Sequence, residues 1–206
     1  MAAPKEKNIG DLNGVWVINS ELSDSTDEIF KLQGMAYTTR TFIGYSTVTL
    51  TLTQTIGKPP APAAADAPEV TQVVIEQTLA PVRLMPSIKG TRESRCLDGL
   101  KRSHEDHIFG KVEGYSKFIE RADVKDADLE KNWAPEDEER AGPENKAHIL
   151  SFVRNLDEGK GWEATQIWGF QIVDGERRYC RNIRVTKPGA ETIYARLVYD
   201  YKGPAQ

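Results

Sequence analysis

The sequence predicts an all-β protein with minor α content, folded as a closed up-and-down antiparallel β-barrel of about eight to ten strands. Residues 47–56 alternate strictly between apolar and polar side chains, which is the period of a half-buried strand. Later strand-like runs are separated by tight-turn signals, such as Asp98-Gly99 and Asp174-Gly175. Because sequential hairpins that close on themselves leave no open edge, a barrel accounts for this pattern. A short helical lid near the N-terminus and one helical insertion complete the expected fold.

Composition bounds the remaining possibilities. The chain has 206 residues and is expected to form a single domain, 1–206. Its net charge of −4 argues against a nucleic-acid partner, because phosphate binding needs clustered cations. No apolar run is long enough to span a bilayer, and the polar first ten residues do not read as a signal peptide, so we expect a cytoplasmic protein without stable membrane insertion. The two cysteines, Cys96 and Cys180, form neither a disulfide framework nor a metal motif.

The first quarter of the chain, residues 11–56, is read as strand, helical lid and long strand. The opening strand contains Trp16, which we expect to pack the barrel floor as a large buried aromatic. The lid runs from Ser23 to Ile43, and Gly34 suits the left-handed residue that ends a helix. The second strand is expected to bury Val48, Leu50, Leu52 and Ile56 on one face.

The lid supplies candidate ligand-binding residues. Met35, Tyr37 and Phe42 lie between the first lid helix and the alternating strand. They are flanked by Gly34 and Gly44, which allow bending there. A ligand that enters a barrel plugged at its floor would pass these residues.

The rest of the chain is read as strands with one interruption. Residues 58–69 hold four prolines, which forbid a regular helix or central strand and predict a hairpin loop. Residues 121–160 are read as an insertion in which Pro143–Leu156 has helical spacing. The expected strands cover residues 70–79, 91–97, 101–109, 111–120, 162–173, 178–186 and 192–201.

Residues 101–107 are the stretch densest in reactive side chains. His104 and His107 are three residues apart, so a strand points them to opposite faces and they do not ligate one metal together. A single barrel-facing histidine, for which we name His107, could serve as a general base beside a carboxylate. The alternative is a solvated charged strand with no catalytic role.

Other polar residues are expected to line a partly hydrated cavity. Glu93 and Arg95 share a strand face, and Arg181 lies on the face opposite Arg184. Trp168 is the expected aromatic wall. We name Arg95 and Tyr179, with His107, as candidate catalytic residues that polarise a carbonyl, and Arg181 and Trp168 as ligand-binding residues.

The opening segment resembles a known family. Gly14-Val15-Trp16, a helix pair broken at Gly34, and a strand beginning at Thr47 are similar to the start of the fatty-acid-binding proteins, and more broadly to the calycin superfamily that includes the lipocalins. Uncharacterised proteins of filamentous fungi are also similar. The resemblance implies an arginine of the last strand lying across Trp16, for which Arg196 is the first candidate and Arg184 the second. It also implies an inward Arg-x-Tyr on the last strand, but in Arg196-Leu197-Val198-Tyr199 the tyrosine falls on the opposite face.

Two functions remain open. The first is intracellular binding of a small hydrophobic or amphipathic molecule in the barrel, with Arg196 among the ligand-binding residues. The alternative is a cofactor-independent isomerase or cyclase of the pericyclase type, acting on a natural-product intermediate in the same cavity. Neither function implies a metal or a cofactor. A homodimer is left open beside the monomer.

Overall fold

The computed structural model describes residues 2–80, 89–106, 108–139 and 142–205. Ten antiparallel strands form one sheet in which strands that follow one another in the sequence pair, except β4 and β5, and the first strand also pairs with the last. The strands are β1 (Gly14–Ile18), β2 (Val48–Gly57), β3 (Val70–Leu79), β4 (Thr91–Cys96), β5 (Arg102–Asp106), β6 (Gly110–Ile119), β7 (His148–Asn155), β8 (Glu163–Val173), β9 (Glu176–Thr186) and β10 (Ile193–Gly203).

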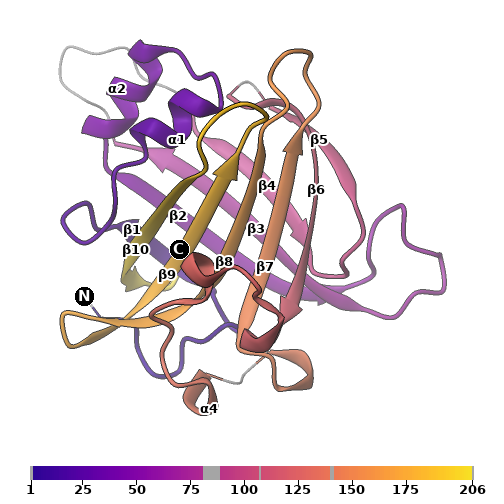
Figure 1. Ribbon diagram of the computed structural model, residues 1–206. Coiled ribbons are helices and arrows are strands. Elements are labelled where there is room, and N and C mark those ends of the chain that lie inside the picture. The colour runs from indigo at the N-terminus through magenta and orange to yellow at the C-terminus, as the bar shows by residue number, and fades with distance from the viewer. Residues whose placement is uncertain (1, 81–88, 107, 140–141, 206) are drawn as a thin grey trace.

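The sheet is strongly curled (Figure 1), and its spatial order is β4-β3-β2-β1-β10-β9-β8-β7-β6-β5. The all-β antiparallel architecture is confirmed. Within the described residues, no ladder joins the two end strands, β4 and β5. The connection after β4 crosses to β6 instead, where the Gly99 amide donates a hydrogen bond to the Ser116 carbonyl at 2.9 Å. The sheet is therefore a curled half-barrel, with a gap between β4 and β5.

Trp16 closes one end of this half-barrel. Its side chain is fully buried, and the indole Nε1 donates to the Leu12 carbonyl at 2.9 Å. The rings of Phe170, Tyr179 and Tyr201 surround it. This cluster is the floor.

Neither arginine expected over Trp16 lies there. Arg196 donates to the Leu22 carbonyl, and Arg184 pairs with Asp126, both on the outer face of the sheet. The reason is strand periodicity. Tyr179 of β9 and Tyr199 of β10 point inward, so the even-numbered residues of these strands point outward. The expectation for Arg196 and Arg184 was wrong.

Two short helices cover the opposite end (Figure 1), namely α1 (Asp27–Leu32) and α2 (Tyr37–Tyr45). Gly34 ends the first with a φ of +81°, as its sequence position indicated. Ile29, Phe42 and Ile43 are buried beneath them. No helix in the described part of the chain has the length and apolar character needed to cross a membrane.

The β2–β3 hairpin carries the loop of residues 58–69, which holds neither helix nor strand and projects from the barrel (Figure 1). Ile56, expected in the core, is 74% exposed because it lies beyond the point where β2 leaves the core. Arg102 of β5 donates to the carbonyls of Pro60 and Ala61, at 2.8 and 3.1 Å. The loop is therefore anchored to the far end of the sheet.

The helix expected over Pro143–Leu156 is wrong. Only residues Pro143–Asn145 form a short 3₁₀ turn (η2), and β7 follows. Ile149 packs toward the barrel interior, while Leu150 lies on the outer face beneath other residues. Because both faces of β7 are covered, its apolar residues do not alternate, and such a run cannot be distinguished from a helix by periodicity.

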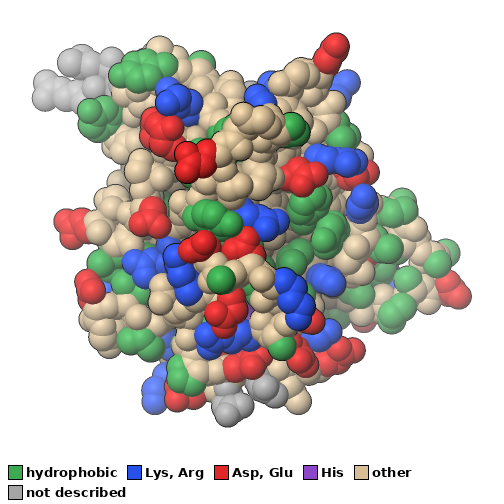
Figure 2. All heavy atoms as spheres, viewed as in Figure 1, with side chains coloured by type: hydrophobic (Ala, Val, Ile, Leu, Met, Phe, Trp, Pro, Cys, Tyr) green, Lys and Arg blue, Asp and Glu red, His purple; other side chains and the backbone are tan. Residues whose placement is uncertain are grey.

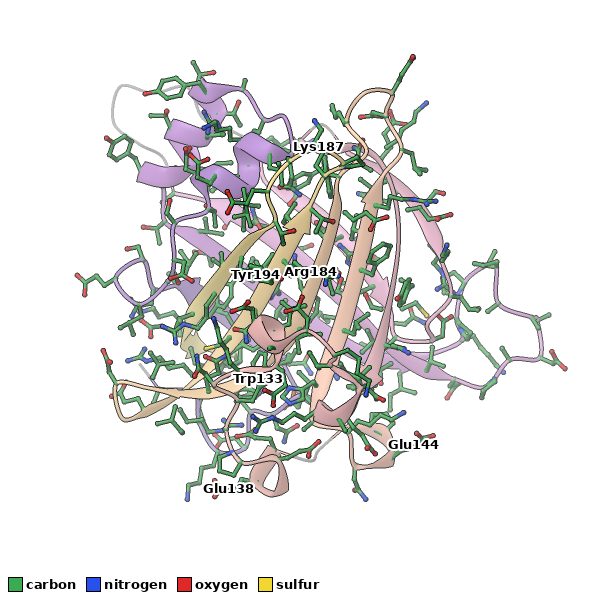
Figure 3. The ribbon with its side chains drawn as sticks, in the orientation of Figure 1. Trp133, Glu138, Glu144, Arg184, Lys187 and Tyr194 are labelled. Carbon is green, nitrogen blue, oxygen red and sulfur yellow. The ribbon has the colours of Figure 1, made fainter. Side chains whose placement is uncertain are left out.

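The cover on the outer face is the segment of residues 120–139, which contains η1 (Arg121–Asp123), α3 (Ala127–Glu130) and α4 (Glu136–Glu139). Leu129 and Trp133 pack over β8 and β9, and Asn182 donates to the Leu129 carbonyl at 3.0 Å. Figure 3 shows Arg184 and Tyr194 side by side above Trp133, and both contact Asp126. Acidic and basic side chains intermingle over this part of the surface (Figure 2).

Candidate functional site

A cavity of about 500 Å³ lies between the lid and the floor. Its size is in the range of small-molecule binding pockets. The part nearest the lid is apolar. It is lined by residues of α1, β6 and β9 and of the segments that precede β6 and β8, namely Ile29, Phe30, Phe109, Val112, Trp162, Ile183 and Val185.

Arg181 forms the cationic part of the wall. Its guanidinium lies 4.1 Å from the Trp168 ring and 5.4 Å from the Tyr199 ring, both of which also line the cavity. The Nε donates to the Tyr179 hydroxyl at 2.9 Å. These contacts fix the plane of the guanidinium, because the cation is held both by ring faces and by a hydrogen bond.

The same guanidinium is under-satisfied. Arg181 is only 8% exposed, and its Nη2 has no hydrogen-bond partner among the described residues. Burial disfavours its charge, but the nearby oxygens of Tyr179, Tyr199 and Glu93 outweigh burial and raise the pKa of Arg181. A buried cation with an unused donor can hold an oxygen acceptor of a bound molecule.

Glu93 and Arg95 of β4 form an ion pair at 2.5 Å across the cavity from Arg181. Burial raises the pKa of the Glu93 carboxyl, but the attraction of Arg95, Arg181 and His104 lowers it by more, so the group is ionised. Arg95 Nε also has no partner in the described structure. Glu93 thus balances the charge of Arg95, whereas Arg181 keeps a buried positive charge in the wall.

Two further polar groups in the wall are buried and have no hydrogen-bond partner among the residues that the structure describes. They are the Trp162 Nε1 near the lid and the Ser116 Oγ on β6. Buried donors are usually satisfied in folded proteins. The unpaired groups of Arg181, Arg95, Trp162 and Ser116 therefore suit a ligand that carries several oxygen acceptors.

The structure brings several predicted residues together. Arg95, Arg181 and Trp168 line one cavity. Tyr179 lies outside the wall, beneath Arg181, and its burial raises its pKa to about 12. It acts on the cavity through Arg181, and at neutral pH it is a phenol and not a base. His107 lies outside the described residues.

Other predicted residues do not reach the cavity. Tyr37 is 72% exposed, Met35 is half-buried, and Phe42 is buried away from the cavity wall. The lid contributes to the wall through α1, with Ile29 and Phe30, and not through α2. Arg196 lies on the outer face. We therefore correct the candidate ligand-binding set by replacing Met35, Tyr37, Phe42 and Arg196 with residues of the cavity wall.

The residues that sequence reasoning missed are Gln166, Trp162 and Tyr199. Gln166 and Trp162 share the strand phase of Trp168, two and six residues earlier, and this signal was available. The sequence analysis correctly put Tyr199 and Arg196 on opposite faces of β10. Which of the two faces points inward could not be decided without knowing what covers β10. The described residues hold no group of three or more histidine, cysteine or acidic side chains that could bind a metal.

Comparisons with known proteins agree with this architecture. No family model matches the sequence. The chain is 28% identical over 203 residues to the probable pericyclase scpY of Mollisia scopiformis, covering 98% of this chain and 96% of that protein. It is 25% identical over 204 residues to the pericyclase pydY of an Acremonium species, covering 99% and 98%.

Solved structures give the fold. The wild-type fluorescent protein UnaG superimposes with a TM-score of 0.54 at 14% identity, covering 93% of this chain and 97% of that one. Fatty-acid-binding protein 1 of Echinococcus granulosus aligns with a TM-score of 0.48 at 12% identity, covering 92% and 96%. The match to UnaG shows that the chain shares its fold, and the chain is similar to fungal pericyclases along nearly its whole length.

Proposed function

We propose that the protein is a pericyclase, which binds a flexible amphipathic molecule in the cavity and catalyses its ring closure. The observation that carries this proposal is Arg181, a buried cation with an unused donor in the wall of a ligand-sized cavity. The similarity to two curated pericyclases over nearly the whole chain supports the same activity.

A pericyclic ring closure needs from the protein mainly a cavity of suitable shape and a suitably placed charge. In a pericyclic cycloaddition the electrons move around a ring of atoms, and no proton or hydride passes between the substrate and the protein. The apolar walls would hold the two reacting ends near each other. The conformational entropy that ring closure costs would then be lost on binding and not in the reaction step. A nucleophile and base are not required.

Arg181 would act on a carbonyl conjugated to one reacting double bond. A hydrogen bond from the guanidinium to that oxygen draws electron density away from the double bond, so an electron-rich diene adds to it faster. The stacking on Trp168 and the bond to Tyr179 fix the donor before the substrate arrives. Preorganised donors of this kind are the largest electrostatic contribution in many enzymes.

A carrier function is the second candidate. The apolar lid end of the cavity, with Ile29, Val112, Trp162 and Ile183, supports simple retention of an amphipathic molecule. The two candidates differ in one respect, which is whether the bound molecule changes.

A linear trienone tests the distinction. In this probe a three-carbon tether joins an enone to a terminal diene. Ring closure forms two carbon–carbon σ bonds at the expense of two π bonds, so the product is an isomer. Without protein the product is racemic. We expect the protein to raise the rate and to yield one enantiomer in excess, measured by chiral chromatography. A racemic product at the uncatalysed rate, with the trienone bound, would leave the carrier function.

Two arginine variants link the activity to the site. Arg181→Met keeps the aliphatic stem and removes the donor, and we expect it to lower kcat by about 10²-fold, as for the loss of an oxyanion donor. Arg196→Met is the matched control, because Arg196 lies on the outer face of the adjacent strand. Melting temperatures of both variants show whether they fold. Equal activity of Arg181→Met and the parent protein would contradict the assigned role.

A further inference from the structure

The cavity is bordered by β4 in an unusual way. On a continuous sheet only alternate residues reach one side, and β8 follows this rule, contributing Ala164, Gln166 and Trp168. All six residues of β4, Thr91–Cys96, border the cavity. Side chains of both faces can meet one cavity only where it passes beyond the edge of the strand.

The facing strand shows the same feature. Arg102, Ser103 and His104 are consecutive in β5, and all three border the cavity. In the described structure β4 pairs only with β3, and β5 only with β6. The cavity therefore extends into the gap between these two edges.

The gap is shut at its floor end. Asp98 pairs with Lys117 as an isolated bridge, and Gly99 is bonded to the Ser116 carbonyl. Arg102 donates two hydrogen bonds to the Asp98 carboxylate, at 2.8 and 2.7 Å. The open part of the gap is therefore nearer the lid, between Thr91–Ser94 and Ser103–Glu105.

An outer groove of about 600 Å³ continues the opening. It shares Gln77, Thr91, Arg92 and His104 with the cavity wall, and its lining also includes Glu76, Thr78, Lys89, Gly90 and Glu105. The groove can thus contact the polar end of an amphipathic molecule while its apolar part lies inside.

The lid, by contrast, is fastened. Arg40 of α2 forms an ion pair with Asp27 of α1 at 2.9 Å, and Met35 donates a backbone hydrogen bond to Phe30 at 2.9 Å. Ile29, Phe42 and Ile43 are buried under the helices. The ion pair and the backbone hydrogen bond join the two lid helices to each other. Lifting them together would expose Ile29, which packs against Trp162 and Ile183 of the barrel, whereas no ladder among the described residues joins β4 to β5.

We infer that amphipathic ligands enter and leave the cavity sideways, through the gap between β4 and β5, with the outer groove as their first contact. This inference rests on the cavity as the ligand site in the proposed function, but not on the reaction. It replaces the expectation that ligands pass the lid residues Met35, Tyr37 and Phe42.

Site-selective blocking tests the route. Single cysteines replace Ser94 on β4, Ser103 on β5 or, as the matched lid control, the exposed Tyr37 on α2. Each is coupled to a bulky polyethylene-glycol maleimide or to the small N-ethylmaleimide. The native Cys96 and Cys180 are buried, and burial raises the pKa values of their thiols to about 11 and about 12, so they react slowly.

The readout is stopped-flow uptake and release of anilinonaphthalenesulfonate, an amphipathic anion that fluoresces in apolar sites. We expect the bulky group at residue 94 or 103 to slow both rates at least tenfold relative to the small group, with the dissociation constant changed much less. The bulky group at residue 37 should leave both rates unchanged. Slowing only at residue 37, or equal rates at all three positions, would overturn the inferred route. If the unlabelled protein takes up no probe, the cavity is not the ligand site, and the proposed function itself fails.

Discussion

Three arginines of the neighbouring strands β9 and β10 show how strand phase assigns roles. Arg181 points inward and lies on Trp168, whereas Arg184 on the same strand pairs with Asp126 outside. Alternation in the sequence separated these two correctly. It could not show that Arg196 of β10 points outward, because the residues that cover β10, including Leu22, belong to a segment far away in the sequence.

Trp16 gives a prediction about the stability of the floor. Trp16→Ala removes a fully buried indole whose Nε1 is bonded to the Leu12 carbonyl. Truncation of a buried tryptophan costs about 3–5 kcal/mol, so the variant should unfold at much lower urea concentration or fail to fold. Urea unfolding followed by circular dichroism measures this, with Tyr37→Ala on the exposed lid surface as the control. Parent-like stability of Trp16→Ala would show that the floor cluster is not structural.

Among the elements, β7 shows which feature local sequence patterns do not predict, namely the cover that a distant segment places on a strand. His148 is buried beside Trp133, with ring centroids 4.8 Å apart, and Gly169 provides the room. A Cβ at residue 169 would lie 2.5 Å from His148 Nδ1. The strand turns and the alternating strands were predictable from local chemistry, whereas β7 was mistaken for a helix because its cover comes from residues 120–139.

His148 makes the stability of this element depend on pH. Burial lowers its pKa to about 4 from an ordinary value of 6.5, outweighing the attraction of Glu136 and Glu130, while Arg121 lowers it further. The unfolded chain therefore takes up a proton more readily, and stability falls as pH drops from about 6.5 toward 4. This lowering of the pKa corresponds to about 3 kcal/mol of unfolding free energy.

We expect His148→Gln to reduce the loss of unfolding free energy between pH 6.5 and pH 4. Urea unfolding from pH 7.5 to pH 4 measures this loss. Both proteins lose stability through other groups, so the informative quantity is the difference between their unfolding free energies. A difference that does not change over this range would contradict the assignment to His148.

The loop of residues 58–69 gives a second prediction for an element. Loop length alone changes stability little, so replacing residues 59–68 by Asn-Gly would be nearly neutral for a free loop. Arg102 is bonded to the Pro60 and Ala61 carbonyls, so we expect a loss of about 1–2 kcal/mol. The same replacement in an Arg102→Gln background should cost less, measured as a double-mutant cycle. Equal costs in both backgrounds would show that these two hydrogen bonds contribute nothing.

For the whole molecule, the central question is how the curled sheet is held. One seam is the ladder between β1 and β10, where Trp16 faces Tyr201. The other is the gap between β4 and β5, spanned at its floor end by Asp98 and its partners. The sequence predicted the strands on both sides but not this seam, because a closed ladder and an open gap need the same strand pattern.

Asp98→Asn tests whether Asp98 and its partners hold the floor end of the gap between β4 and β5. Burial raises the pKa of the Asp98 carboxyl, but hydrogen bonds from Arg102 and the Leu100 amide outweigh it and lower the pKa to about 2. Stability from this group is therefore complete above about pH 4 and is lost as pH falls toward 2. Because water screens this partly exposed ion pair, we expect it to contribute about 1–2 kcal/mol to the unfolding free energy at neutral pH.

We expect Asp98→Asn to lower the unfolding free energy by about this amount at pH 7 and by progressively less below pH 4. Asp66→Asn in the exposed loop is the control. A loss that stays constant down to pH 3 would mean that the ionised carboxylate is not what holds the seam.

The strand order also makes the protein divisible. All strands of β1–β4 lie on one side of the β1–β10 ladder, and all strands of β5–β10 lie on the other. A cut at Leu100, which is 40% exposed in the connection between β4 and β5, would leave two fragments that each hold a contiguous block of strands. Their reunion would restore the β1–β10 ladder, the contacts of Asp98 with Arg102 and Lys117, and the packing of Ile29 and Trp16 against β9. It would also rebuild the cavity wall from both fragments. Fused to two interacting partners, such halves would form a split reporter whose signal is a dye captured at the moment of assembly.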